Sequence, residues 1–226
     1  MNDVEKAIKV FHVEVRTTST AFFAWKSFND VVASDKTVYR VVNANALSWN
    51  ILTHSLQSTF FISLGRLFDT RNDTFSAHRL LNICTENIDQ FSCDSLKQRK
   101  IKSNGGIYPD WLDDFTKSTY QPSIADFRKL KKVVSSQQKI YAEIYKPIRH
   151  KVIAHREINS LDKVGELYGK TNIGQIKDLL IFLHQIDQVL FDLLHNGKLN
   201  DVGTYNFRED SLVQKDIEEL LNRLKL

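Results

Sequence analysis

The sequence predicts an all-α protein: a helical bundle of four to five principal helices with short additional helices. Only 8 Gly and 3 Pro occur in 226 residues, too few for the frequent turns of a sandwich or barrel. Hydrophobic residues make up 42% of the chain and recur at helical spacing, whereas the alternating pattern of strands is nearly absent. We expect residues 1–226 to form a single domain, in which residues 210–226 are a terminal helix that packs on it or is partly mobile.

Two long helices are predicted in the first third of the chain. The first runs from about residue 4 to 32, with Asn2 or Asp3 as its cap. Asp35 can cap a second segment that continues to about Asp69. The apolar residues of that segment recur at four-residue spacing, along one slowly drifting face. They are Leu52, Leu56, Phe60, Leu64 and Phe68.

The middle of the chain is divided by its clearest loop. Ser76 can cap a third helix that continues through Ile83, and the basic segment 97–102 then runs into the loop SNGGIYP. A short turn around Trp111 and Phe115 follows.

The last hundred residues contain two further principal helices. A fourth helix is predicted over residues 123–156, and residues 158–171, with two glycines, are interpreted as a loop. A fifth helix over 172–197 has an Asn cap at its start and a Gly at its end. The charged segment 210–226 forms the final helix.

Composition excludes several classes of protein. The formal charge of +4 and the pI of about 8.9 permit nucleic-acid binding without requiring it. Two cysteines, Cys84 and Cys93, are too few for a disulfide framework and are consistent with free thiols in a reducing cytoplasm. The first residues lack the apolar core of a signal peptide, and the most apolar run, 179–194, is interrupted by polar residues, which rules out a membrane span.

Sequence motifs for cofactors and metals are missing. The chain has no GxxxxGK[ST], GxGxxG, HExxH or GxSxG motif, and no Glu is followed three residues later by His. We therefore expect no cofactor and no metal.

One stretch carries chemistry: YKPIRHKVIAHRE, residues 145–157, in which four basic side chains and two histidines gather. His155 can move protons near neutral pH, and the guanidinium of Arg149 can bind phosphate oxygens in a bidentate way. In RNA the ribose 2′-hydroxyl can itself be the nucleophile, so that no metal is needed. On an ideal helix these two residues lie about 120° apart. Pro147 is expected to kink the helix just before them.

Two interpretations of this stretch remain open. An apolar stripe contains His155 near its centre and leaves Arg149 at its edge. If the stripe faces a two-fold partner, two copies of the motif meet in one cleft. Alternatively, the Arg–His spacing arises by chance, and His155 is a core histidine bonded to backbone. The stripe consists of Ile140, Ile144, Ile148 and Val152.

The motif resembles that of the HEPN superfamily of all-α domains, which is defined by an Arg, four to six further residues and a His near the start of a late helix. The phrase RHKVIAHRE looks like the abortive-infection U-type branch of that superfamily. An earlier helix of that branch is similar to FFISLGRLFDTRNDTFSAHRLL, at residues 60–81. The resemblance therefore covers two predicted helices that are separated in the sequence, and they occur in the order expected for that branch.

The resemblance implies a metal-independent endoribonuclease that works as a homodimer. His155 would be the acid–base residue, Arg149 the phosphate stabiliser and His150 the polar residue that lines the cleft; Lys151 and Arg156 would bind RNA. Such enzymes leave a cyclic phosphate and a free 5′-hydroxyl. They commonly serve in prokaryotic toxin–antitoxin or phage-defence systems, so a cognate antitoxin protein is a possible partner.

Two alternatives to the nuclease stay open. The first is a noncatalytic HEPN module that binds a protein, nucleotide or RNA partner, and the second is a plain helical structural protein.

Other candidates have plainer interpretations. Arg66 and Asp69 are expected to form a local ion pair. The basic residues 128–132 and 97–102 could follow RNA phosphates, but a solvated helix face is the simpler interpretation. His195 is expected to complement a helix dipole.

Overall fold

The computed structural model describes residues 3–71, 73–154, 164–203 and 209–225, and each of these segments contains helices. No strand occurs in these ranges, so the all-α prediction is confirmed for them. The elements are α1 (Asp3–Ser34), α2 (Lys36–Ala44), α3 (Ala46–Leu67), α4 (Ala77–Glu86), the 3₁₀ turn η1 (Ile88–Phe91), α5 (Cys93–Ser103), α6 (Leu112–Lys117), α7 (Ile124–Ile140), the π-helical η2 (Tyr141–Tyr145), α8 (Lys146–Ile148), the π-helical η3 (Arg149–Ala154), α9 (Val164–Gly169), α10 (Ile173–Asn196) and α11 (Glu209–Arg223).

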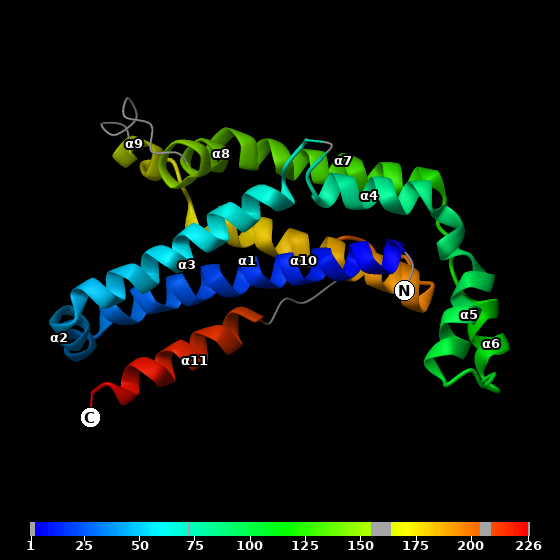
Figure 1. The fold of residues 1–226 in the computed structure, drawn as a ribbon, viewed down its shortest axis with the longest axis horizontal. Helices are drawn as coiled ribbons and strands as arrows, with labels where there is room; N and C mark the ends of the chain where they lie inside the picture. The colour runs from blue at the N-terminus through cyan, green and yellow to red at the C-terminus, as the bar shows by residue number, and fades with distance from the viewer. Residues whose placement is uncertain (1–2, 72, 155–163, 204–208, 226) are drawn as a thin grey trace.

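The long helix α1 organises the molecule (Figure 1). Helices α3 and α10 pack along it, and α11 packs against it near the C-terminus of the chain. Helices α4 and α7 lie side by side, while α2 lies at one end of the elongated molecule and α5 and α6 lie at the other. The helix α7 continues through η2 and α8 into η3, which reaches α3.

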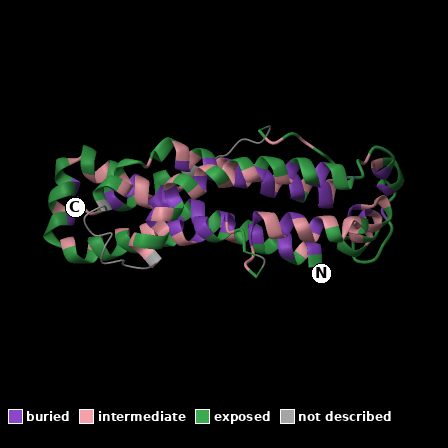
Figure 2. Ribbon diagram, turned by 90° about the horizontal axis from the view of Figure 1, so that it is seen from above, coloured by how far each residue is buried: buried purple, intermediate pink, exposed green. Residues whose placement is uncertain are grey.

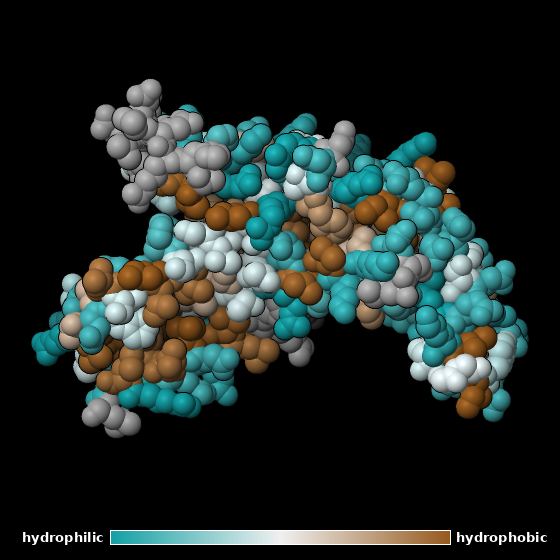
Figure 3. All heavy atoms as spheres, viewed as in Figure 1, coloured by the Kyte–Doolittle hydropathy of each residue, from teal (hydrophilic) through white to brown (hydrophobic). Residues whose placement is uncertain are grey.

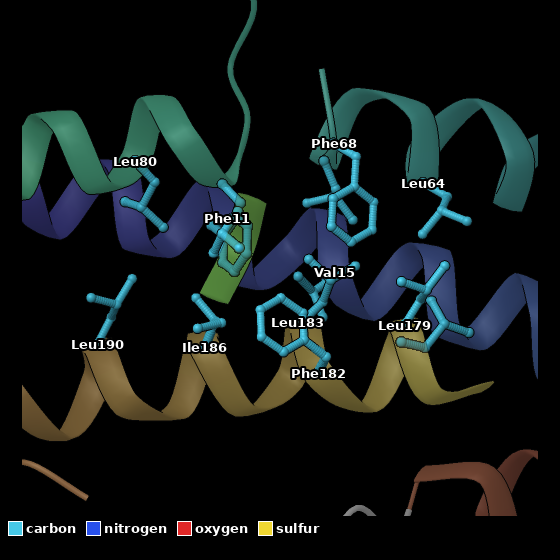
Figure 4. Close-up of a cluster of buried hydrophobic side chains, with 14 of the residues drawn as sticks. Phe11, Val15, Leu64, Phe68, Leu80, Leu179, Phe182, Leu183, Ile186 and Leu190 are labelled. Atoms are coloured by element: carbon cyan, nitrogen blue, oxygen red, sulfur yellow. The ribbon is translucent and has the colours of Figure 1, made fainter. Parts of the chain in front are cut away.

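The main core fills the space between α1, α3, α4 and α10 (Figure 4). Phe11 and Val15 of α1 point toward Leu183 and Ile186 of α10, and Leu64 closes the core from α3. Figure 2 shows that buried residues recur along the central helices, between intermediate and exposed ones. Burying side chains of this size stabilises each by roughly 1.5–3 kcal/mol, so the core fixes the places of the four helices.

A second, smaller core lies at the α2 end. Phe28 of α1 packs with Val38 and Val42 of α2 and with Leu221 of α11. Helix α11 therefore supplies a buried apolar side chain to the end of the α1–α2 hairpin.

Most helix ends lie where the sequence predicts them, because capping residues next to each end determine them. Asp35, Ser76 and Asn172 each accept a hydrogen bond from a backbone N–H in the first turn of the helix that follows. Gly197 ends α10 in the left-handed conformation, with φ of 56°, which glycine adopts without steric cost.

The structure corrects two predictions. The segment predicted from Asp35 to Asp69 is two helices, because Asn45 leaves helical geometry (φ −126°, ψ 39°) between α2 and α3. The predicted loop 158–171 contains the short helix α9, in which Gly165 and Gly169 are tolerated; residues 155–163 lie outside the described residues. Among the helices described, none is both long enough and apolar enough to cross a bilayer.

A partly buried histidine links α10 to α1 and makes stability depend on pH. The Nε2 atom of His184 lies 2.8 Å from the Ser19 hydroxyl oxygen. Burial, followed by the charges of His12 and Arg16, lowers the pKa of His184 to about 4. Because the unfolded chain then binds more protons than the folded one as the pH falls from the ordinary histidine value, stability is lost on acidification.

We expect the free energy of unfolding to fall by about 2–3 kcal/mol between pH 7 and pH 4.5 through this group. The substitution His184→Gln keeps a hydrogen-bonding partner for Ser19 but cannot take up a proton, so it should flatten that loss. Urea unfolding at several pH values measures the effect, with His54→Gln on exposed α3 as the matched control. An unchanged pH slope in His184→Gln would contradict the assignment.

Candidate functional site

A pocket of about 350 Å³ lies where the end of α3 meets η2, α8 and η3. Its volume is within the range of small-molecule sites. Three basic side chains and one carboxylate face it, so its lining carries net positive charge. The lining residues are Gly65, Phe68, Asp69, Thr70, Arg71, Gln138, Tyr141, Lys146, Arg149 and His150.

Two π-helical turns shape the helix that carries the motif. Pro147 lies in α8, between η2 and η3. A proline has no N–H to donate and its ring collides with the carbonyl four residues earlier, here that of Glu143 in η2. The wider π turn accommodates this proline, where the sequence predicts only a kink. Of the predicted apolar stripe, Ile148 is buried and the other members are half-buried, because Tyr141 and Tyr145 take the inner positions.

The side chain of Arg149 crosses α3 at a glycine. A Cβ atom added to Gly65 would collide with Cδ and Nε of Arg149 and would lie 2.8 Å from the Tyr141 hydroxyl oxygen. Only a residue without a side chain lets the guanidinium stem lie this close to the helix backbone. Position 65 therefore determines where Arg149 can lie.

The contact leaves polar atoms unsatisfied beside the pocket. Nε of Arg149 and the hydroxyl oxygen of Tyr141 are buried and have no hydrogen-bond partner among the described residues. Burial raises the pKa of Tyr141 to about 12, against the opposing effect of the neighbouring Arg149 charge. Tyr141 is thus a neutral hydroxyl at physiological pH, and its ring stacks on Phe68 at 5.4 Å.

The carboxylate of Asp69 is held between two arginines. Arg71 donates to it from Nε (3.2 Å to Oδ2) and from Nη2 (3.0 Å), and the Arg71 backbone N–H also donates to it. Burial acts to raise the pKa of Asp69, but the hydrogen bonds of Arg71 and the charge of Arg149 outweigh it, so the pKa lies below its ordinary value. The ionised carboxylate offsets part of the positive charge around Arg149.

Comparison with known proteins decides the family. A family model of the HEPN class, described as AbiU2, matches residues 1–211. The chain belongs to the AbiU2 family of HEPN proteins. No curated protein and no solved structure shows a significant match.

The predicted Arg–His motif lies only partly within the described residues. Arg149 and His150 line the pocket, together with Lys146, which the sequence argument did not single out. Lys151 is exposed and outside the pocket lining. His155 and Arg156 lie outside the described residues, so the structure shows the arginine end of the motif alone.

The predicted Arg66–Asp69 ion pair is wrong. Helix α3 ends at Leu67, so Asp69 is not on the same helix face, and it pairs with Arg71. Arg66 instead reaches α1, where its Nη2 lies 2.6 Å from Oε1 of Glu14.

His195 lies in the last turn of α10, as expected, but burial lowers its pKa, which disfavours the charged form that would complement the helix dipole. Arg99 donates to the carbonyl oxygen of Leu194 at 2.6 Å.

The sequence argument missed Gly65, Tyr141 and Arg71 as neighbours of Arg149. A glycine inside a long apolar helix was the available signal, since it indicates close approach of another group. Among the described residues of this AbiU2-family chain, no group of three or more His, Cys, Asp or Glu is placed to hold a metal ion.

Proposed function

We propose that this protein is a metal-independent endoribonuclease with its active centre at the Arg149–His155 motif. The observation that carries the proposal is the placement of Arg149, held across Gly65 in a positively charged pocket at the start of the family motif. A guanidinium fixed in a partly water-excluded site is suited to stabilise charge that develops on a phosphate.

The reaction is a transesterification at phosphorus. A histidine base removes the proton of the ribose 2′-hydroxyl, the 2′-oxygen attacks the phosphorus, and the bond to the 5′-oxygen breaks. The leaving 5′-oxygen takes up a proton, so the products are a 2′,3′-cyclic phosphate and a 5′-hydroxyl. His155 moves the protons, Arg149 stabilises the phosphorane charge, and His150 lines the cleft.

A row of exposed basic side chains on α7 supports RNA as the substrate. Residues 124–154 contain eight basic and two acidic residues, so this segment is more positive than the whole chain. Arg128, Lys132 and Lys139 lie within about 40° of one another around α7, opposite its buried face, and Lys146 continues the row into the pocket. These cations, with Lys151 and Arg156, would bind the RNA backbone by neutralising phosphates.

The proposed active unit is a homodimer in which two motifs share one cleft. Ile140, Ile144 and Val152 are half-buried, which leaves apolar surface on the motif helix for a second copy. We infer that residues 1–226 act as one domain. We also infer a role in a prokaryotic toxin–antitoxin or phage-defence system in the cytoplasm, with an antitoxin protein as partner.

The test is incubation of the purified protein with mixed RNA in excess EDTA. We expect cleavage, with cyclic-phosphate and 5′-hydroxyl ends identified by end-specific labelling. Intact RNA at enzyme excess would contradict the nuclease and favour a noncatalytic binding module.

A further inference from the structure

A second pocket lies away from the motif, at the other end of α10. It has a volume of about 360 Å³ and opens between α5, the first turn of α1 and the last turn of α10. Figure 3 shows the surface hollowed between the α5–α6 end and the rest of the molecule, with mainly hydrophilic side chains around the hollow. The residues that line this α5 pocket are Glu5, Arg99, Lys100, Lys102, Ser103 and His195.

Basic side chains outnumber acidic ones in the α5 pocket. Three cations line it against one carboxylate, so its net charge is positive. The third lysine of α5, Lys97, lies outside the pocket, with its Nζ 2.8 Å from a carboxylate oxygen of Asp113. Among the described residues, no carboxylate forms an ion pair with Lys100 or Lys102. A bound anion would supply the opposite charge that these two lysines lack.

Burial and mutual repulsion make the charge in the α5 pocket costly. Burial, followed by the charge of Arg99, lowers the pKa of Lys100 and of His195. The carboxylate of Glu5 acts in the opposite direction on His195 without outweighing these effects. An anion bound between these groups would lower the cost, because an opposite charge within about 4–6 Å favours the charged form of a basic side chain.

The guanidinium of Arg99 is a fixed charge beside the pocket. Its Nη1 donates to the carbonyl oxygen of Gln90 at 2.7 Å, and its Nη2 donates to that of Leu194 at 2.6 Å. These bonds join η1 to the last turn of α10, so Arg99 also holds the fold together. Lys100 and Lys102 make no such bonds to carbonyl groups, and they are the cations that can turn to a ligand.

The side chains of the α5 pocket are those that bind phosphate groups. Guanidinium and ammonium groups form charge-assisted hydrogen bonds with phosphate oxygens. Within the part of the chain that the structure describes, the lining contains no Phe, Tyr, Trp or aliphatic side chain on which a nucleobase could stack. The pocket therefore suits a phosphate whose sugar and base lie outside it, as they do along a nucleic-acid strand.

One RNA strand can span the distance between the α5 pocket and the motif pocket. His195 is twenty-three residues beyond Asn172, about 35 Å along α10. The hydroxyl of Tyr145, next to Lys146 of the motif pocket, donates to the Asn172 carbonyl oxygen at 3.1 Å. At about 3.4 Å per stacked nucleotide, roughly ten nucleotides cover this distance. Helix α7, with its row of basic side chains, runs from the motif pocket toward the α5–α6 end (Figure 1).

We propose that the α5 pocket binds a backbone phosphate of the RNA strand, about ten nucleotides from the phosphate that lies in the motif pocket. Lys100 and Lys102 bind the phosphate oxygens, and the fixed charge of Arg99 adds to the attraction. The inference rests on RNA as the ligand in the proposed function, and it adds a second binding site that requires a long strand.

Anisotropy of end-labelled single-stranded RNA tests this contact, in EDTA and with His155→Ala in every protein so that the RNA stays intact. The variant carries Lys100→Gln and Lys102→Gln and keeps Arg99. For a single strand, each phosphate contact lowers the logarithm of affinity by about 0.7 per tenfold rise in salt. We therefore expect the variant to bind a twenty-nucleotide RNA about fivefold more weakly at 0.1 M salt, with little difference near 1 M. The loss should be smaller for a five-nucleotide RNA, which cannot reach both pockets.

The matched control carries Lys97→Gln and Lys117→Gln, which remove the same charge from α5 and α6 outside the pocket. It should bind RNA as its parent does, and circular dichroism verifies both folds. Equal RNA affinity in the pocket variant and its parent would overturn the proposal, as would an equal loss in the control. If inorganic phosphate then raised the thermal unfolding temperature of the parent and not of the pocket variant, the ligand would be free phosphate.

The assay also separates this inference from the nuclease assignment. Because it measures binding, it reports on the α5 pocket whether or not the protein cleaves RNA. Weaker RNA binding in the pocket variant, combined with intact RNA in the cleavage test of the chain with His155, would support the pocket and contradict the nuclease. Cleavage by that chain, combined with unchanged RNA binding in the pocket variant, would do the reverse.

Discussion

Arg149→Ala and His155→Ala are each expected to abolish RNA cleavage. Loss of a positioned acid–base group lowers a rate by about 10²–10⁴-fold, and loss of a charge-stabilising donor lowers it by about 10²–10³-fold. Arg149→Lys retains the charge but loses the planar fork, so we expect an intermediate rate. Initial rates on end-labelled RNA in EDTA measure all three variants, and circular dichroism verifies their folds. Wild-type rates in both alanine variants would place the chemistry elsewhere in the protein.

The same two variants test whether the motif cleft is shared. A mixed dimer of Arg149→Ala and His155→Ala chains retains one intact arginine and one intact histidine on opposite chains. If one site uses groups from both chains, mixing the two inactive proteins should restore part of the activity. A mixture as inactive as its components would indicate that each chain holds its own complete site.

Gly65→Ala is the second substitution with a large expected effect. The new methyl group would occupy the space of Arg149 Cδ and Nε and press on the Tyr141 hydroxyl. Since a misplacement of about 1 Å can lower a catalytic rate by about 100-fold, we expect a loss of that order. In a helix interior alanine is more favourable than glycine by about 1 kcal/mol, and this offsets part of the strain. We therefore expect the protein to remain folded. Cleavage rates and urea unfolding, measured together, separate the two effects.

Two further variants make this result specific. Gly165→Ala in α9 adds a methyl group that meets no atom of the described residues within 4 Å and should leave cleavage unchanged. In the background of Arg149→Ala, only the Tyr141 hydroxyl remains close to position 65, so adding Gly65→Ala should strain the fold less than it does in the wild-type chain. If Gly65→Ala cleaves RNA at the wild-type rate, the glycine contact does not position Arg149 for function.

The helix ends were predictable because their signals are local. Asp35, Ser76 and Asn172 bond to backbone groups two or three residues away, and Gly197 adopts a conformation that its own chemistry permits. All the groups that form such a signal lie within one helical turn of each other in the sequence. The break at Asn45 was not predictable in this way, because the residues on both sides of it favour helix and Asn is only weakly unfavourable.

The candidate site was predictable at Arg149 and His150 and not at its surroundings. The spacing of Arg149 and His155 drew attention to the motif helix. The partner of Arg66, by contrast, is Glu14 on α1, and the stem of Arg149 lies on Gly65 of α3. These contacts join residues that are far apart in sequence, so no helical spacing reveals them.

The two π-helical turns also set a length requirement on the motif helix of this chain. A π turn encloses one residue more than an α turn, so η2 and η3 amount to residues inserted into a longer α-helix. Deleting one residue from η2 could return it to α geometry with little harm to the backbone. Every later side chain would then rotate by about 100°, and a residue other than Arg149 would face Gly65. Homologous chains one residue shorter between Tyr141 and Arg149 can therefore keep the helix and lose the site.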